Sequence, residues 1–192
     1  MLFENNTIKI DKVPNVLDDL VLEFTEILGK YYKYVIISGY VTILLGRTRA
    51  TEDIDVLIEK RNGEIFSKLW KALLENGFYC LNTENMNEAL SYLEEGLAIR
   101  FAKTATVIPN FEVKFPKNEL EHQALKERIK VELPKGIIFI PKIEQQIAVK
   151  RILPASEKDV EDAIYLEELF KGKLNKEKLN HYIELCKKLK EK

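Results

Sequence analysis

The chain has 192 residues, enough for one compact domain with a real core, or for one domain with a small helical appendage. Its 46% apolar and 32% charged residues are typical of a soluble globular protein, and no apolar run approaches the roughly 20 residues of a membrane span. A net charge of -1 argues against nucleic-acid binding by bulk electrostatics and leaves only local basic patches for that purpose.

The N-terminal segment and the two cysteines indicate the compartment in which the protein is expected. The N-terminal segment MLFENNTIKIDK carries acidic and amide groups where a secretory signal needs a basic start and an apolar stretch. Cys80 and Cys186 lie far apart, without a CxxC or Cys/His cluster, so neither a disulfide framework nor a zinc site is expected. We therefore expect a cytoplasmic protein with no membrane partner.

The first 81 residues alternate between helical and strand patterns. Apolar residues at helical spacing, Gly breakers and short β-branched runs mark the boundaries. The predicted elements are a helix over 16–28 that stops before Gly29, a strand over 34–38, a short helix over 40–45, a strand over 53–59, a helix over 64–75 with Gly77 as its breaker, and the start of a strand at 78–81.

After a polar stretch at 82–88, the runs 97–103, 106–108 and 111–115 have strand character and are expected to neighbour one another in one sheet. A helix over 118–128 and a hairpin over 129–133 and 136–140 follow. Pro141 then opens a helix to about Ile152, a second helix ends near Gly172, and a third covers 176–190. Ser156 and Asp159 have the spacing of a capping box at the start of the second of these helices.

This order predicts an α/β (α+β) fold, with a mixed β-sheet core flanked by helices and a C-terminal helical part. We place the α/β core at residues 1–140 and the helical region, packed on that core, at residues 141–192.

Asp53 and Asp55 are one residue apart in a predicted strand, so their side chains point to one face, roughly 6 to 7 Å apart. Two like charges at that distance either sit at a solvated strand end or hold a cation. Magnesium suits the second case, because it takes oxygen ligands and is usually bound by one or two carboxylates together with substrate phosphates. A solvated strand end remains the structural alternative.

A turn and a third acid would complete such a site. Ser38 and Gly39 lie where a strand ends and a short helix begins, a place where free N–H groups favour an anion and glycine permits close approach. Glu112, flanked by apolar residues in a later strand, is the best third carboxylate, and Glu59 and Glu132 are weaker candidates.

The segments ISGY, GRTRATEDIDVLI and FEVKF together resemble the signature of the nucleotidyltransferase superfamily with the DNA polymerase β fold: a small-residue turn, a DxD strand and a third acid on an adjacent strand. The RxTxDID form at 49–55 is especially similar to the small prokaryotic branch that includes the abortive-infection type IV toxin nucleotidyltransferases. Looser similarity in IPKIEQQIAVKRI and SEKDVEDAIYL extends the resemblance over about residues 34 to 170.

The resemblance implies a nucleotidyltransferase core and a Mg-dependent transfer of a nucleoside monophosphate from a nucleoside triphosphate to an acceptor hydroxyl, on RNA or protein. Glu112 would complete the metal site and is a candidate acceptor for the hydroxyl proton. The residues implied as metal ligands and catalytic groups are Asp53, Asp55 and Glu112. The resemblance implies Ser38 and Gly39 as the residues that hold the triphosphate. Thr51 is a further nucleotide-binding candidate, as are Arg49, Lys150 and Arg47, because guanidinium and ammonium groups bind phosphates, with exposed and merely solvated basic side chains as the alternative.

Two departures from the family pattern are visible: bulky Tyr40 follows Ser38-Gly39, which would narrow the phosphate turn, and the third acid is Glu where Asp is common. Asp159 and Asp162 are explained by capping and surface solvation. An alternative function is a non-catalytic nucleotide- or partner-binding protein of the same fold, such as a toxin–antitoxin component with a partner protein. The other alternative is a soluble α/β protein in which the DxD motif is structural.

Overall fold

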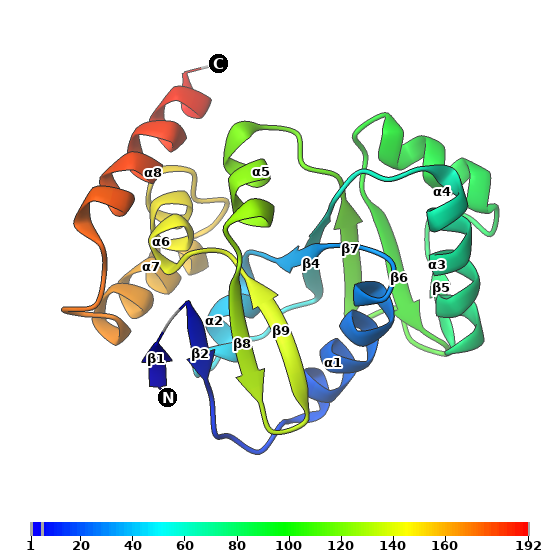
Figure 1. The fold of residues 1–192 in the computed structure, drawn as a ribbon, viewed down its shortest axis with the longest axis horizontal. Helices are drawn as coiled ribbons and strands as arrows, with labels where there is room; N and C mark the ends of the chain where they lie inside the picture. The colour runs from blue at the N-terminus through cyan, green and yellow to red at the C-terminus, as the bar shows by residue number, and fades with distance from the viewer. Residues whose placement is uncertain (1, 5, 192) are drawn as a thin grey trace.

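The computed structural model describes residues 2–4 and 6–191, and within these ranges the chain forms eight helices and nine strands in two sheets (Figure 1). Strands and helices are mixed along the chain, and the larger sheet contains both parallel and antiparallel pairs. The predicted α+β fold class is therefore confirmed. Among the described residues, no helix is long and apolar enough to cross a membrane.

The larger sheet has the order β3-β4-β7-β6-β5. Its central pair, β4 and β7, is parallel, and the other three pairs are antiparallel. The strands are β3 (Tyr34–Ile36), β4 (Asp53–Ile58), β5 (Phe78–Cys80), β6 (Ile99–Lys103) and β7 (Asn110–Lys114).

One face of this sheet carries the main hydrophobic core. Ile54 and Val56 of β4 and Phe111 of β7 are completely buried there. Phe24 of α1 (Val16–Gly29) stacks on Phe111 with ring centroids 3.8 Å apart, and α3 (Gly63–Glu75) adds Trp70 to the same cluster. Since side chains alternate along a strand, Asp53, Asp55 and Leu57 point to the opposite face.

A second sheet has the order β1-β2-β8-β9, with β1 (Leu2–Glu4), β2 (Thr7–Lys9), β8 (Ile129–Leu133) and β9 (Gly136–Ile140). Its β8–β9 hairpin confirms the prediction, whereas the two short N-terminal strands were not predicted. The two sheets pack on one another, with Tyr34 of β3 edge-on to Phe139 of β9 at 5.6 Å.

The helices after the hairpin lie together on one side of the molecule, next to the N-terminus in space (Figure 1). They are α6 (Ile143–Ile152), α7 (Glu157–Leu169) and α8 (Lys176–Lys190). Helix α6 packs against α7 and α8, and α7 also contacts α2 (Gly39–Leu44). Ile143, Ile147, Leu166 and Phe170 join the main hydrophobic cluster. The helices α5 (Glu119–Lys126) and α8 also touch.

Three local predictions are wrong. Residues 106–108 form no strand, and Val107 and Ile108 are exposed beyond the turn at Ala105, whose φ is 66°. The polar stretch instead leads into a helix, α4 (Met86–Glu94), capped by Asn85. The capping box at Ser156 does not form, because both Asp159 oxygens are taken by the Lys150 ammonium and the Ala155 N–H.

Candidate functional site

Three carboxylates lie together on the face of the larger sheet opposite the main hydrophobic core. Asp55 of β4 is directly opposite Glu112 of β7 in the parallel register, and Asp53 shares the face of Asp55. Burial raises the pKa of Asp53, and the nearby negative charges of Asp55 and Glu112 raise it further. The β4–β7 pairing thus brings together the three acids singled out in the sequence.

Two basic side chains accompany these acids. Lys114, two residues after Glu112 on the same face of β7, places its Nζ 3.0 Å from Asp55 Oδ1 and 3.4 Å from Glu112 Oε1. Arg100 of β6, opposite Glu112, contacts Glu112 Oε2 at 2.5 Å. Burial lowers the pKa of Lys114, but its contacts with Asp55 and Glu112 outweigh this, so that the net shift is upward.

This pairing bears on metal binding. In the described part of the chain, no three His, Cys, Asp or Glu side chains converge as a metal-ion site. The donor chemistry nevertheless fits a hard cation such as magnesium, since the cluster offers carboxylate oxygens from two adjacent strands. The positive charge beside Asp55 and Glu112 is supplied by Lys114 in this structure.

The turn between β3 and α2 is strained at Ser38. Its φ of 62° and ψ of −137° belong to a region that only glycine occupies easily. A Cβ on the next residue, Gly39, would lie 2.9 Å from Nη2 of Arg49, so the Arg49 guanidinium, which Asp162 holds, would have to shift. Helix α2 has six residues, so an anion at this turn would depend on backbone N–H groups and neighbouring cations more than on a helix dipole.

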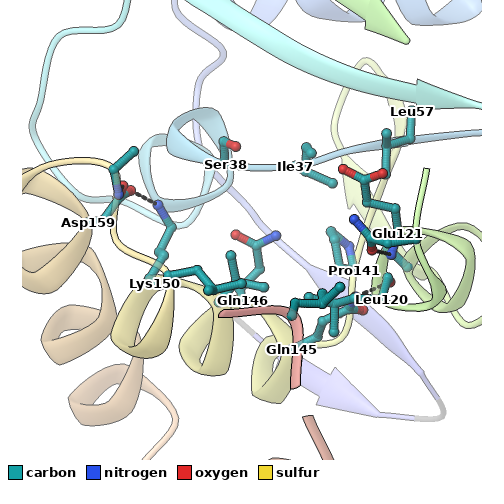
Figure 2. A pocket seen from close by; sticks show the side chains of 16 residues that line it. Ile37, Ser38, Leu57, Leu120, Glu121, Pro141, Gln145, Gln146, Lys150 and Asp159 are labelled. Atoms are coloured by element: carbon teal, nitrogen blue, oxygen red, sulfur yellow. Dashed lines mark hydrogen bonds and ion pairs between the residues drawn. The ribbon is translucent and has the colours of Figure 1, made fainter. Parts of the chain in front are cut away.

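A cavity of about 210 Å³ opens beside this turn, between the sheet and α6 (Figure 2). It lies on the face that carries the three acids, because Leu57, which lines it, alternates in phase with Asp53 and Asp55. The side chains that shape it include Ile37, Ser38, Leu57, Leu120, Gln146 and Lys150.

Two amides of α6 contribute to the cavity. Gln145 donates through Nε2 to the carbonyl oxygen of Leu120 at 2.6 Å, while its buried Oε1 has no partner among the described residues. Gln146 points from α6 toward the end of β3 (Figure 2). A small apolar cavity with a few polar groups is the usual form of a small-molecule site, and 210 Å³ suits part of a ligand rather than a whole drug-sized one.

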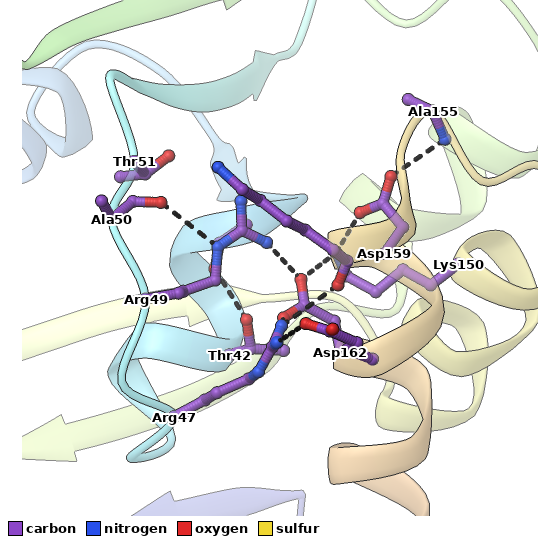
Figure 3. A network of polar contacts seen from close by, with 12 residues as sticks. Thr42, Arg47, Arg49, Ala50, Thr51, Lys150, Ala155, Asp159 and Asp162 are labelled. Atoms are coloured by element: carbon purple, nitrogen blue, oxygen red, sulfur yellow. Dashed lines mark hydrogen bonds and ion pairs between the residues drawn. The ribbon is translucent and has the colours of Figure 1, made fainter.

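A buried ionic network joins this region to α7 (Figure 3). Asp162 is fully buried and pairs with Lys150 at 2.7 Å, with Arg49 at 2.5 Å and with Arg47. Burial by itself raises the pKa of Asp162. Contacts with Lys150, and then with Arg47 and Thr42, outweigh burial, so that the net shift of the pKa is downward. The expectation that Asp162 is a solvated surface residue is therefore wrong. Asp159 also serves the network, since its Oδ1 accepts a hydrogen bond from Lys150 at 2.8 Å.

Tyr40 does not narrow the turn. Tyr40 belongs to α2, and its side chain is completely buried. Its hydroxyl donates to Oδ1 of buried Asp18 at 2.9 Å. Burial and then the charge of Asp18 raise the pKa of Tyr40. The residue is a core side chain with a satisfied hydroxyl, so its bulk does not narrow the turn.

The other residues expected at the site are divided between the cavity and its surroundings. Ser38 and Lys150 both line the cavity, although Lys150 is only 2% exposed. Arg49 lies over the turn at Gly39. Thr51 donates its hydroxyl to the backbone oxygen of Asp53 at 2.8 Å, just before β4. The two weaker acid candidates lie apart from this cluster: Glu59 contacts Arg61, and Glu132 belongs to the other sheet.

Sequence reasoning missed Lys114, Arg100 and Gln146. Strand alternation offered a signal for Lys114, because a residue two positions after Glu112 must share its face. Nothing in the sequence places Arg100 opposite Glu112, since that contact depends on the register of β6 and β7.

No family model matches the chain, and no curated protein matches its sequence. Among solved structures, the chain is similar to an antigenic nucleotidyltransferase-like protein from Paracoccidioides brasiliensis, with 16% identity and a TM-score of 0.49 over 90% of this chain and 88% of that one. At this level of similarity, any functional inference rests on the side chains described above.

Proposed function

We propose that this protein is a nucleotidyltransferase that transfers a nucleoside monophosphate from a nucleoside triphosphate to a hydroxyl group of an RNA or protein acceptor. The observation that carries the proposal is the position of Asp53, Asp55 and Glu112 on one sheet face, the same face whose Leu57 lines the cavity at the Ser38 turn, although none of the three acids lines that cavity itself. Acids that could hold a metal and a cavity that could hold the base of a nucleotide thus share one face of the sheet.

The cavity suggests how a nucleotide would bind. Its apolar walls at Ile37, Leu57 and Leu120 suit a base, and the amide of Gln146 offers a hydrogen-bond donor and acceptor. The triphosphate would then extend toward the Ser38 turn, where backbone N–H groups favour negative charge. Lys150 would reach it only by giving up one of its two aspartate partners, Asp159 or Asp162.

Magnesium is the cofactor we propose, with Asp53, Asp55 and Glu112 as its protein ligands. When bound, it would neutralise charge that develops on the phosphates. The acceptor oxygen forms a new bond to the α-phosphorus, the bond from that phosphorus to the bridging oxygen breaks, and pyrophosphate leaves. The acceptor proton passes to a carboxylate of the cluster, and the protein contributes chiefly by holding the two reactants in line.

The test begins with nucleotide binding, measured by calorimetry with and without magnesium for each of the four common nucleoside triphosphates. We expect binding that depends on magnesium and that is lost in the double variant Asp53→Asn with Asp55→Asn. Asp19→Asn removes an exposed carboxylate from α1, on the far side of the sheet, and is the matched control. Unchanged affinity in the double variant would contradict the proposal.

The second step supplies α-labelled triphosphates with magnesium and a pool of RNA and protein, and identifies what becomes labelled. We expect label to enter a macromolecule with the wild-type protein and not with the double variant. Release of pyrophosphate in equal amount checks that a monophosphate was transferred.

A second candidate is a nucleotide- or partner-binding protein of this fold without catalysis. The contacts of Lys114 and Arg100 with two of the three acids favour it, because cations held in that way oppose metal binding. This candidate predicts nucleotide or partner binding that does not need magnesium, and no label in any acceptor.

A further inference from the structure

Lys114 occupies a central position in the carboxylate cluster. Its Nζ lies within 3.4 Å of both Asp55 and Glu112, and the side chains of all three are 16 to 21% exposed. An ammonium group has three donors, so it can donate to both carboxylates at once, although its single positive charge offsets only one of their two negative charges. Lys114 therefore lies where a bound divalent cation would have to compete with it.

The carboxylate oxygens show how direct this competition is. Lys114 takes Oδ1 of Asp55 and Oε1 of Glu112, and Arg100 takes Oε2 of Glu112. Of the six oxygens in the cluster, three are thus engaged by protein cations, including both oxygens of Glu112. A metal that used Glu112 as a ligand would therefore have to share an oxygen with one of these cations or displace it.

We propose that Lys114 is a built-in counter-cation that disfavours binding of a free divalent metal and makes the metal enter together with the nucleotide. The inference rests on the proposed function. A free ion that displaces Lys114 leaves the ammonium without its two partners. A metal–nucleotide complex brings phosphate oxygens that can receive the ammonium, so it offsets that loss.

The proposal makes Lys114 a positioning and selectivity residue for the metal. Its long flexible side chain carries a single point charge, so it can swing from the carboxylates to a phosphate without a change in the strand. Arg100 is more exposed, at 46%, and Glu112 is its one acidic partner among the three carboxylates, so its effect on the metal should be smaller.

The experiment measures free Mn²⁺ by electron paramagnetic resonance during titration of the protein, with and without a non-hydrolysable nucleoside triphosphate analogue. For Lys114→Met we expect Mn²⁺ alone to bind about tenfold more tightly than to wild type, since two ionic contacts no longer compete. The nucleotide should improve Mn²⁺ binding strongly in wild type and much less in the variant.

Two variants serve as controls. Lys114→Arg keeps the charge and should retain the wild-type dependence on nucleotide, which also covers the case in which the Met variant does not fold. Lys103→Met removes a lysine from the end of β6 that pairs with Glu23 instead of the cluster, and it should bind Mn²⁺ as wild type does.

Three results would overturn the proposal, and they separate it from the proposed function. If wild type binds free Mn²⁺ as tightly as Lys114→Met does, Lys114 does not compete and only this inference fails. If the Met variant binds Mn²⁺ more weakly than wild type, Lys114 supports the metal instead of opposing it. If neither protein binds Mn²⁺ even with nucleotide, the metal-dependent function fails as well.

Discussion

The buried carboxylate of Asp162 should be the most sensitive charged group in the protein. It is fully buried and contacts three cations, of which Lys150 is itself only 2% exposed and Arg47 and Arg49 are 16% and 14% exposed. The change Asp162→Asn keeps the shape of the side chain but removes its charge. It leaves these cations facing an amide whose N–H groups are also donors.

The size of the expected loss of stability follows from the burial of Asp162 and of its partner Lys150. Removing one partner of a buried ion pair costs about 3–5 kcal/mol, because the other charge stays desolvated and unpaired. That is a large part of the roughly 5–15 kcal/mol by which a domain is stable. For a chain of this size, it corresponds to a melting temperature lower by roughly 6 to 20 °C.

The assay is urea unfolding of wild type, Asp162→Asn and Glu161→Gln. Glu161 is the neighbouring acid and also contacts Arg47, but its side chain is 64% exposed, so its loss should cost only about 0.2–1 kcal/mol. Combining Asp162→Asn with Lys150→Met should cost less than the sum of the single changes, since the two residues are in contact. Equal small losses for Asp162→Asn and Glu161→Gln would refute the reasoning.

The difference in unfolding free energy between wild type and Asp162→Asn should depend on pH with a definite sign. The pKa of Asp162 is lowered in the folded protein, so its stabilising contribution is complete above the unfolded value of about 3.9 and is lost as the pH falls through the lower folded value. The gap between wild type and Asp162→Asn should therefore be constant near neutral pH and close only in strong acid. A gap that closes already between pH 7 and 5 would point to another titrating group.

Three further changes test the surroundings of the turn. Ser38→Gly should raise the free energy of unfolding in urea by about 1 kcal/mol. It relieves backbone strain of about 1–3 kcal/mol at φ 62°, but glycine makes the unfolded chain more flexible, which cancels part of this gain. Ser38→Ala keeps the strain and should give no such gain. Gly39→Ala should destabilise by about 1–3 kcal/mol, since its Cβ meets the Arg49 guanidinium, and the loss should shrink in an Arg49→Gln background. Tyr40→Phe should cost about 1.5–3 kcal/mol through the lost bond to Asp18, while calorimetry shows unchanged nucleotide affinity.

The elements that sequence predicted correctly have a strong periodic pattern and clear ends. The helix at Val16–Gly29 buries one apolar stripe and begins at Asn15, whose side chain forms a capping box with Asp18. Helix α4 was missed although Met86, Ala89, Leu90 and Leu93 recur at helical spacing and Asn85 caps the helix. It is only nine residues long, and the polar residues before it made the whole segment look like a loop. Residues 106–108 show the opposite failure, since β-branched residues there meet no partner strand.

Tertiary pairing accounts for the missed N-terminal strands. Strand β2 has three residues and exists through its parallel pairing with β8, some 120 positions later in the chain. No local pattern of three residues carries that information, since the partner strand and its register are set by the fold as a whole. The second sheet was therefore beyond local prediction, although its hairpin was not.

The arrangement of the candidate site depends on two things: the alternation of side chains along each strand, which can be predicted from the sequence, and the register between β4 and β7, which cannot. Alternation alone puts Asp53 with Asp55 on one face, and Glu112 with Lys114 on another strand's face. Register then decides that these two faces are the same surface, with Asp55 opposite Glu112. Asp53 and Asp55 of β4 thus lie beside Glu112 and Lys114 of β7. A cation that bound these carboxylates would compete with Lys114, which belongs to the same FEVKF segment as Glu112. On the function we propose, the chemistry of the site would depend as much on the release of Lys114 from Asp55 and Glu112 as on the two aspartates.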